Sequence, residues 1–280
     1  MTLVFSRSAV EAALDAGEAL GLLAEGFRVA GSDGQRHRGE LPGPGTAMCL
    51  MPGLLPGIPA YTVKVNAKFP GSTPALRGVV CLFDLATGEL LALLDSASVT
   101  AWRTGLAAAL AIRVLGPERP ETIGFVGAGA QNAMVHRGLA HAGTQEKVVV
   151  WDLDPAKAAA FAAGAEVADP LPVADVVVCA TWAREPIVRE RRPGQFLVSL
   201  GADEPGKIEI GLDVLASSRV IVDDLALGVP GAAGTLGQVL RGEIPARADV
   251  YLPVGLPWQD LALAWTVYQT RAGTPIDLLS

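Results

Sequence analysis

The feature that most constrains the fold is a glycine-rich turn between an apolar run and a helical pattern, at residues 122–138 ("TIGFVGAGAQNAMVHRG"). In a dinucleotide site, the glycine corresponding to Gly127 permits the tight turn after the strand. The one corresponding to Gly129 lets the backbone approach a pyrophosphate at the helix N-terminus. A third glycine is usual where this chain has Asn132. The pattern alone is therefore equally compatible with an ordinary strand–helix turn.

The residues that follow favour a nucleotide loop. The next apolar run, "KVVVWD", ends at Asp152, where a dinucleotide site has a carboxylate that accepts hydrogen bonds from ribose hydroxyls. A carboxylate without a neighbouring arginine would repel a 2′-phosphate, so we expect NAD(H) in preference to NADP(H). The alternative role for Asp152 is that of a helix N-cap ahead of Pro155.

Short apolar runs bounded by Gly, Pro or Asp alternate with helical patterns after residue 120. They lie at residues 122–129, 147–152, 174–181, 194–203 and 217–224. This alternation is typical of a parallel, doubly wound sheet. We therefore expect an α/β fold with a Rossmann-type domain at residues 120–250.

The remaining residues, 1–119 and 251–280, are expected to form an α+β domain into which the Rossmann-type domain is inserted. Ser8 and Glu11 match a capping box and predict one helix from Ser8 to Val29. Further patterns predict a hairpin and two helices, at residues 77–95, 96–117 and 256–273.

Composition narrows the function. Half of the residues are apolar and 18% are charged, which is ample for a large core. The net charge of −7 argues against a nucleic-acid surface. The three histidines have no ligand spacing, so no metal is expected.

The chain is not expected to enter a membrane. Residues Leu41 to Val63 carry no charge but contain five prolines, which a spanning helix could not tolerate. We expect an irregular buried connection there. Cys49, Cys81 and Cys179 are far apart and the N-terminus does not resemble a signal peptide, so we expect a cytoplasmic protein with reduced thiols.

Several segments together resemble the ornithine cyclodeaminase/mu-crystallin family, and they occur in that family's order. They are "YTVKVNAKFPGS", "VTAWRTGLAAA", "GAGAQ", "LVSLGADEPGKIEI", "VIVDD" and "LPVGLPWQDLALA". The resemblance implies a homodimer, a Rossmann domain that binds NAD(P), and a substrate-binding and dimerisation domain. It also implies hydride transfer at the α-carbon of a small amino or imino acid.

The resemblance assigns cations to the substrate carboxylate. Arg103 lies in the first turns of its helix, where a guanidinium can hold a carboxylate through two hydrogen bonds. Lys64 is isolated in an apolar strand and is expected to bind substrate and to assist catalysis. Arg38 is expected to be the second carboxylate-binding arginine, with Arg36 an equally good candidate. Asp203 is expected to move the proton at the substrate nitrogen.

The cofactor is expected to contact the glycine loop and the two strands beside it. The expected residues are Gly127, Gly129, Ala130, Gln131, Asp152 and Thr181. In this family, Gln131 takes over part of the contact with the nucleotide.

Two departures from the family matter. Residues 153–174 are too few for the helix, strand and second helix that the family usually has there.

Ornithine cyclodeaminases have an acidic residue where this chain has Cys49, which cannot pair with the distal amine of ornithine. We therefore expect reduction of a cyclic imino acid, pyrroline-2-carboxylate or piperideine-2-carboxylate. The alternatives are an alanine-type dehydrogenase, a cyclodeaminase with recycled NAD, and a non-catalytic NAD(P)H-dependent binding protein.

Overall fold

The computed structural model describes residues 1–29, 36–39, 48–141, 146–202, 206–229 and 231–278. It divides the chain into two compact units. Unit 1 comprises Met1–Arg103 and Gly255–Ser280, and unit 2 comprises Thr104–Val254. The long helix α3 (Ser96–Leu115) begins in unit 1 and ends in unit 2. The units therefore change inside α3, ahead of the boundary at residue 120 that the sequence patterns suggested.

Unit 1 is built on a seven-stranded sheet with the order β15-β1-β6-β5-β4-β3-β2. Neighbouring strands are antiparallel, except that β1 is parallel to β6. The strands are β1 (Thr2–Phe5), β2 (His37–Gly39), β3 (Met48–Gly53), β4 (Ala60–Lys68), β5 (Leu76–Asp84), β6 (Leu90–Asp95) and β15 (Thr274–Ile276). The expected hairpin is confirmed as β5 and β6.

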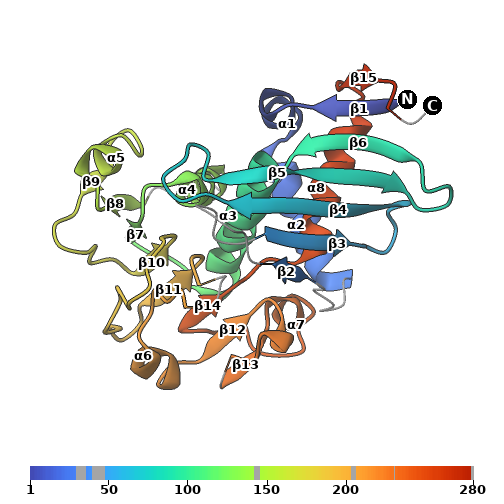
Figure 1. Ribbon diagram of the computed structural model, residues 1–280. Coiled ribbons are helices and arrows are strands. Elements are labelled where there is room, and N and C mark those ends of the chain that lie inside the picture. Colours follow the sequence, from blue (N-terminus) through green and yellow to red (C-terminus); the bar gives the residue numbers. More distant parts are fainter. Residues whose placement is uncertain (30–35, 40–47, 142–145, 203–205, 230, 279–280) are drawn as a thin grey trace. The chain divides into compact units, whose positions relative to one another are not determined.

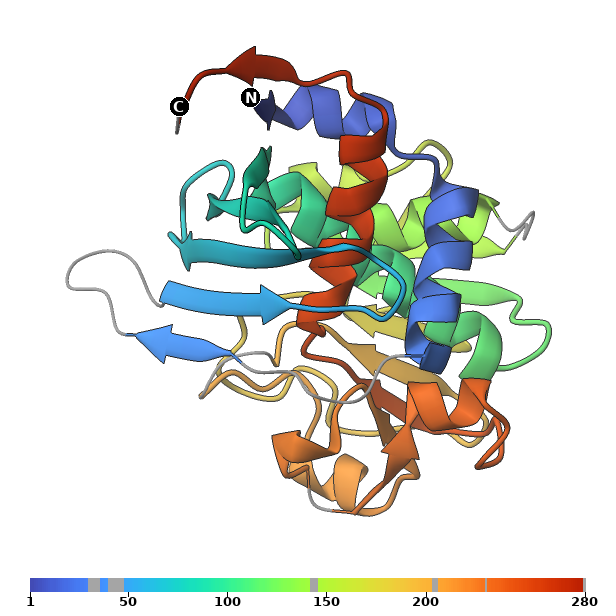
Figure 2. The same ribbon diagram turned by 90° about the vertical axis from the view of Figure 1, so that its right-hand side faces the viewer.

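Helix α8 (Pro257–Gln269) covers one face of this sheet, where it packs against β3, β4, β5 and β6. Helix α2 (Ala16–Val29) packs against α8, and Figures 1 and 2 show the two helices on the same side of the strands. Side chains of β4 alternate in burial, and Thr62, Lys64 and Asn66 are buried on the face toward α8. A lysine on that face is enclosed by the core.

The single helix expected from Ser8 to Val29 is wrong. The structure has α1 (Arg7–Ala13) and α2, separated at Leu14 and Asp15. The Asp15 carboxylate accepts hydrogen bonds from the backbone N–H groups of Gly17 and Glu18 and so starts a second helix. Ser6, not Ser8, is the N-cap of α1.

The irregular connection expected between Leu41 and Val63 is also wrong in part, because β3 lies within it. This strand pairs with β4 from Met48 opposite Ala67 to Gly53 opposite Thr62.

Unit 2 contains an eight-stranded, wholly parallel sheet with the order β13-β12-β14-β11-β10-β7-β8-β9. This arrangement confirms the doubly wound sheet. The strands are β7 (Thr122–Val126), β8 (Lys147–Trp151), β9 (Glu166–Val167), β10 (Val176–Cys179), β11 (Phe196–Ser199), β12 (Val220–Val222), β13 (Ala232–Thr235) and β14 (Val250–Leu252). The helices that follow strands are α4 (Ala130–His141), α5 (Pro155–Ala159), α6 (Leu212–Ala216), η1 (Leu225–Leu227) and α7 (Leu236–Leu240).

Two regions of unit 2 differ from the expected pattern. Strand β14 begins at Val250, where the Rossmann-type domain was expected to end, and it pairs with both β11 and β12. Between Asp152 and β10 the chain forms only α5, the two-residue β9 and an irregular segment. The second helix that the family usually fits there is absent from this described stretch.

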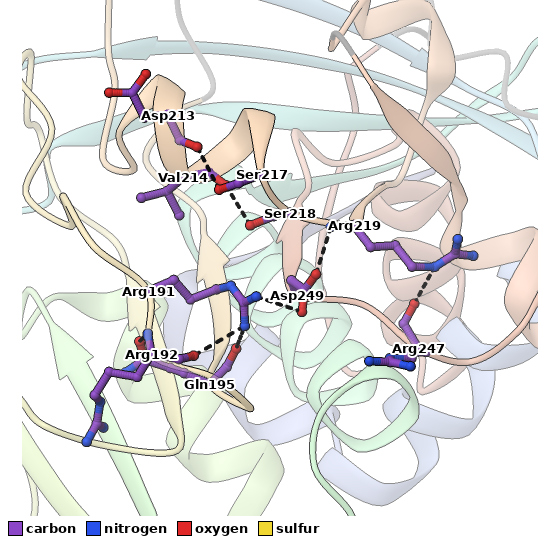
Figure 3. Close-up of polar contacts among 10 residues, drawn as sticks. All are labelled: Arg191, Arg192, Gln195, Asp213, Val214, Ser217, Ser218, Arg219, Arg247 and Asp249. Carbon is purple, nitrogen blue, oxygen red and sulfur yellow. Dashed lines mark hydrogen bonds and ion pairs between the residues drawn. The ribbon is translucent and has the colours of Figure 1, made fainter.

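Polar contacts fix the amino edge of the sheet in unit 2 (Figure 3). The carboxylate of Asp249, immediately before β14, accepts a hydrogen bond from the Arg219 backbone and pairs with the Arg191 guanidinium at 3.1 Å. Arg191 also donates to the carbonyl oxygen of Gln195, next to β11. These contacts are structural and lie at the edge where strands begin, whereas ligands of open α/β sheets bind where strands end.

Candidate active site

A buried cluster of three charged side chains lies in unit 1. Lys64 comes from β4, Asp260 from the first turn of α8, and Arg103 from α3. The Lys64 ammonium is 2.7 Å from Asp260 Oδ2, and both side chains are fully buried. Arg103 Nε is 3.5 Å from Asp260 Oδ1, and Arg103 is only 6% exposed. The structure therefore brings Lys64 and Arg103 together, as the sequence predicted, around a carboxylate that it did not assign.

The protonation of Lys64 is finely balanced. The pKa of Lys64 is lowered from 10.5 to about 8, chiefly by burial and to a smaller extent by the nearby charge of Arg103. The charge of Asp260 and the hydrogen bond to it oppose this change. Lys64 is thus a cation at neutral pH that loses its proton in mildly alkaline solution.

The cluster leaves hydrogen-bonding capacity unused. Lys64 has three ammonium hydrogens, of which one points to Asp260 and one to the Thr100 hydroxyl at 3.4 Å. Arg103 Nε and Asp260 Oδ1 are buried and have no hydrogen-bond partner among the described residues. Unsatisfied buried polar groups are costly, so a bound anion would be favoured beside this guanidinium.

Gly255 helps to place the guanidinium. Its φ of +82° is one that other residues rarely adopt, and a Cβ there would overlap the Arg103 side chain. The carbonyl oxygen of Gly255 accepts a hydrogen bond from Arg36. Arg36 is therefore attached to the segment that carries Asp260, whereas Arg38 is exposed on β2. Of the two arginines considered for the second carboxylate-binding position, the structure thus places Arg36 beside Gly255 and Arg38 on an exposed strand.

In unit 2, the glycine loop has the geometry of a nucleotide cradle. Gly127 has φ of +94°, and a Cβ there would lie 2.6 Å from the Ala180 carbonyl oxygen. A Cβ on Gly129 would meet nothing within 4 Å, and Gly129 and Ala130 are exposed at the start of α4. The loop thus presents open backbone at a helix N-terminus, where a phosphate is favoured.

Asp152 and Asn132 both hold this loop. The Asp152 carboxylate accepts a hydrogen bond from the Ala128 N–H at 2.7 Å, and the helix N-cap is Asp154, not Asp152. The Asn132 side chain is fully buried and donates to the Gly127 carbonyl oxygen at 2.7 Å. Asn132 stands where a third glycine is usual, and its side chain is accommodated there by hydrogen bonds to the backbone of the loop. The buried Gln131 Oε1 has no hydrogen-bond partner among the described residues.

The other predicted residues lie as follows. Thr181 follows β10 at the carboxyl edge of the sheet, and its hydroxyl donates to Glu209. Asp203 lies outside the described residues, so its position is not tested. The paired aspartates of "VIVDD" bond to backbone: Asp223 accepts from the Val254 N–H, and Asp224 caps η1.

Sequence reasoning missed Asp260 as a member of the cluster. A signal was available, because Asp260 is the acidic residue of the quoted "LPVGLPWQDLALA" segment and is surrounded by apolar residues. A carboxylate in such a helix needs a buried partner.

Two broader expectations concern metals and membranes. Within the described ranges, no group of three or more His, Cys, Asp or Glu side chains could hold a metal ion. None of the helices in the described part of the chain is long and apolar enough to cross a bilayer.

The chain is similar to known proteins over nearly its whole length. The model of the ornithine cyclodeaminase/mu-crystallin family matches residues 2–274. The alanine dehydrogenase of Archaeoglobus fulgidus is 26% identical over 96% of this chain and 94% of its own length. The Delta(1)-pyrroline-2-carboxylate reductase 2 of Burkholderia ambifaria is 35% identical over 63% of this chain and 61% of its own.

The fold has a close counterpart of known structure. An archaeal alanine dehydrogenase dimer with bound NAD superposes with a TM-score of 0.87 and 26% identity, covering 99% of both chains. The shortened segment after β8 has therefore not changed the architecture.

Proposed function

Because the chain belongs to the ornithine cyclodeaminase/mu-crystallin family, we propose that it is an NAD(H)-dependent oxidoreductase acting on a carbon–nitrogen bond. Its substrate is a cyclic imino acid, pyrroline-2-carboxylate or piperideine-2-carboxylate, which it reduces to proline or pipecolate. The observation that carries the proposal is the buried Lys64–Asp260–Arg103 cluster, in which Arg103 Nε has no hydrogen-bond partner among the described residues.

The cluster suits a substrate with one carboxylate. Lys64 and Arg103 contribute two positive charges and Asp260 removes one, so the three side chains together carry one positive charge at neutral pH. Arg103 through Nε and Lys64 through its third ammonium hydrogen can donate hydrogen bonds to an α-carboxylate, and Arg36 adds a further cation near Gly255. Fixing the carboxylate at two points orients the carbon–nitrogen bond for reaction.

Among the described residues, Asp260 is the acidic side chain that contacts Lys64, and the residue at position 49 favours a substrate without a distal amine. Cys49 lies on β3 opposite Asn66, on the same sheet face as Lys64. It is the residue that stands where ornithine cyclodeaminases have an acidic side chain. A thiol cannot offset the desolvation of an ammonium as a carboxylate would. The named activity of the Burkholderia relative, a pyrroline-2-carboxylate reductase, supports the same substrate class.

The glycine loop of unit 2 fits a nicotinamide dinucleotide, which supplies the hydride when bound. Gly127, Gly129 and Ala130 would hold the pyrophosphate, and Gln131, in the first turn of α4, would contact the nucleotide. The Asp152 carboxylate supports NAD(H) over NADP(H), because it would repel a 2′-phosphate. Asp203 is proposed to carry the proton to the substrate nitrogen, on the strength of its sequence segment.

A second candidate is an alanine-type dehydrogenase. The alanine dehydrogenase of A. fulgidus aligns over nearly the full length of this chain, which favours this candidate. Alanine also has one carboxylate and no distal amine, so the cluster would suit it.

One assay separates the candidates. The purified protein is incubated with NADH and each cyclic imino acid, with NADH, pyruvate and ammonia, and with NAD and ornithine. We expect NADH consumption with a cyclic imino acid. Ammonia release from ornithine without net NADH change would instead identify a cyclodeaminase. NADH binding without turnover of any substrate would identify a binding protein.

The pH dependence of carboxylate binding should report Lys64. Since the pKa of Lys64 is about 8, its positive charge is present below that pH and lost above it. The affinity for pyrrole-2-carboxylate, whose own charge is constant from pH 6 to about 9.5, should fall about tenfold as the pH rises from about 7 to about 9.5. In Asp260→Asn the fall should begin at lower pH, because Asp260 raises the pKa of Lys64.

Lys64→Arg provides the control, since arginine stays protonated throughout this range. Its affinity should be independent of pH. An unchanged pH profile in Asp260→Asn would show that Asp260 does not act on Lys64.

We also propose a homodimer formed through the sheet face opposite to α8. That face carries half-buried apolar side chains, namely Tyr61, Val63, Val65, Val79, Cys81, Phe83 and Leu93. An apolar sheet face of this kind is typical of a protein interface. The archaeal alanine dehydrogenase, of closely similar fold, is described as a dimer.

Placing a charge on this face should dissociate the dimer. In light scattering, the wild type should have twice the chain mass of 28.9 kDa, and Val63→Lys should have the mass of one chain. Leu85→Lys, in the exposed turn after β5, is the matched control and should remain dimeric. A monomeric wild type would contradict the proposal.

A further inference from the structure

The carboxylate of Glu209 is buried at the carboxyl edge of the sheet in unit 2 and connects two strands. It is 1% exposed. Its Oε1 accepts hydrogen bonds from the Thr181 N–H at 2.6 Å and the Thr181 hydroxyl at 2.7 Å. Its Oε2 accepts from the Ser199 hydroxyl at 2.6 Å and the Gly201 N–H at 2.8 Å. Thr181 follows β10 and Ser199 ends β11, so one side chain joins the ends of neighbouring strands.

The ion pairs found among the described residues do not include Glu209. Its charge acts on the adjacent core, where burial and the Glu209 charge raise the pKa of Cys179. Burying an unpaired charge is expensive, and the four hydrogen bonds are what offset the cost. A residue needed only for packing would not require a charge in this position.

Backbone contacts hold Glu209 from the other side. Its carbonyl oxygen accepts hydrogen bonds from the N–H groups of Ile187 and Val188, both at 2.9 Å. Gly201 must be a glycine, since a Cβ would lie 2.4 Å from Glu209 Oε1. The segment after β10 and the segment after β11 are therefore fixed to one carboxylate.

The network reaches the glycine loop through Thr181. A Cβ on Gly127 would lie 2.6 Å from the Ala180 carbonyl oxygen and 3.2 Å from Thr181 Cγ2, so the loop rests directly on these two residues. The Thr181 hydroxyl donates its hydrogen to Glu209 and accepts from the Ala183 N–H at 3.2 Å. It has no hydrogen left to donate to a cofactor.

We propose that Glu209 is a positioning residue that fixes Thr181 under the glycine loop and so sets the affinity for the dinucleotide. The inference rests on the proposed cofactor. It gives Thr181 a supporting role in place of direct hydrogen-bond donation to the nucleotide.

Titration of the apoprotein with NADH, followed by energy transfer from tryptophan to the bound nicotinamide, tests this role without turnover. Glu209→Gln should raise the Kd for NADH about tenfold, which corresponds to about 1.4 kcal/mol. The amide presents a donor to a backbone N–H that cannot reverse its direction. Glu166→Gln, an exposed residue of the same unit that pairs with Lys147, should leave the Kd within about twofold of wild type.

Thr181 supplies a second pair of variants that does not disturb the carboxylate. Thr181→Val removes the hydroxyl and should raise the Kd for NADH about threefold to tenfold. Thr181→Ser retains the hydroxyl and should have the Kd of the wild type. A purely structural role would lower Tm without changing the Kd of the folded protein. The inference is overturned if wild type binds NADH and both Glu209→Gln and Thr181→Val bind within about twofold of it. If Glu209→Gln does not fold, Thr181→Val alone decides. A wild type that binds no NADH overturns the proposed function itself.

Discussion

Replacing Arg103 with methionine should reduce kcat/KM for the cyclic imino acid about 100- to 1,000-fold, or about 3–4 kcal/mol. The guanidinium is buried at 6% exposure and makes no hydrogen bond through Nε among the described residues. Its loss would leave the substrate carboxylate with Lys64, whose charge is already shared with Asp260. Steady-state kinetics at saturating NADH would measure the loss.

The effect should depend on the shape of the group as well as on its charge. Arg103→Lys keeps the charge but not the planar fork, so it should recover only part of the activity. Arg113→Met, on an exposed position of the same helix, is the matched control and should retain wild-type kinetics. The NADH affinity should be unchanged in all three proteins. Wild-type kcat/KM in Arg103→Met would remove Arg103 from the substrate site.

The second large effect is expected at Gly129. A Cβ there meets nothing within 4 Å, so Gly129→Ala should fold normally and keep the Tm of the wild type. The same methyl group would occupy the space through which the pyrophosphate approaches the backbone. NADH binding should therefore weaken about 100-fold, or about 2.7 kcal/mol.

Gly164→Ala is a suitable control for this substitution. Gly164 lies in the same unit, and a Cβ there also meets nothing within 4 Å, but its φ of +81° makes alanine strained. The control should lower Tm and leave NADH affinity unchanged, which is the reverse of the result expected for Gly129→Ala. Tight NADH binding by Gly129→Ala would show that the pyrophosphate does not approach the loop at this residue.

The parts of the protein that local patterns specify were predictable from the sequence. The strand, glycine turn and helix at residues 122–138 are contiguous, so their chemistry predicts their conformation. The hairpin of β5 and β6 is similar, since its turn lies between two apolar runs. Asn132 was harder to interpret, because its bonds to the backbone of the loop are visible only in three dimensions.

The buried charges could not be placed from local patterns. Lys64 and Asp260 are 196 residues apart, and only the packing of α8 on β4 brings them to 2.7 Å. Glu209 likewise bonds to Thr181, which is 28 residues away in the sequence. Asp15 shows the same limit on a small scale. Its apolar neighbours fit a continuous helix, yet its carboxylate caps a new one.

The most direct test of the substrate site is a crystal structure of the protein with NAD and L-proline. We expect both carboxylate oxygens of proline to lie within hydrogen-bonding distance of the Arg103 guanidinium and the Lys64 ammonium, with Asp260 still bound to Lys64. A proline carboxylate held by other side chains, with the cluster unchanged and untouched, would contradict this expectation.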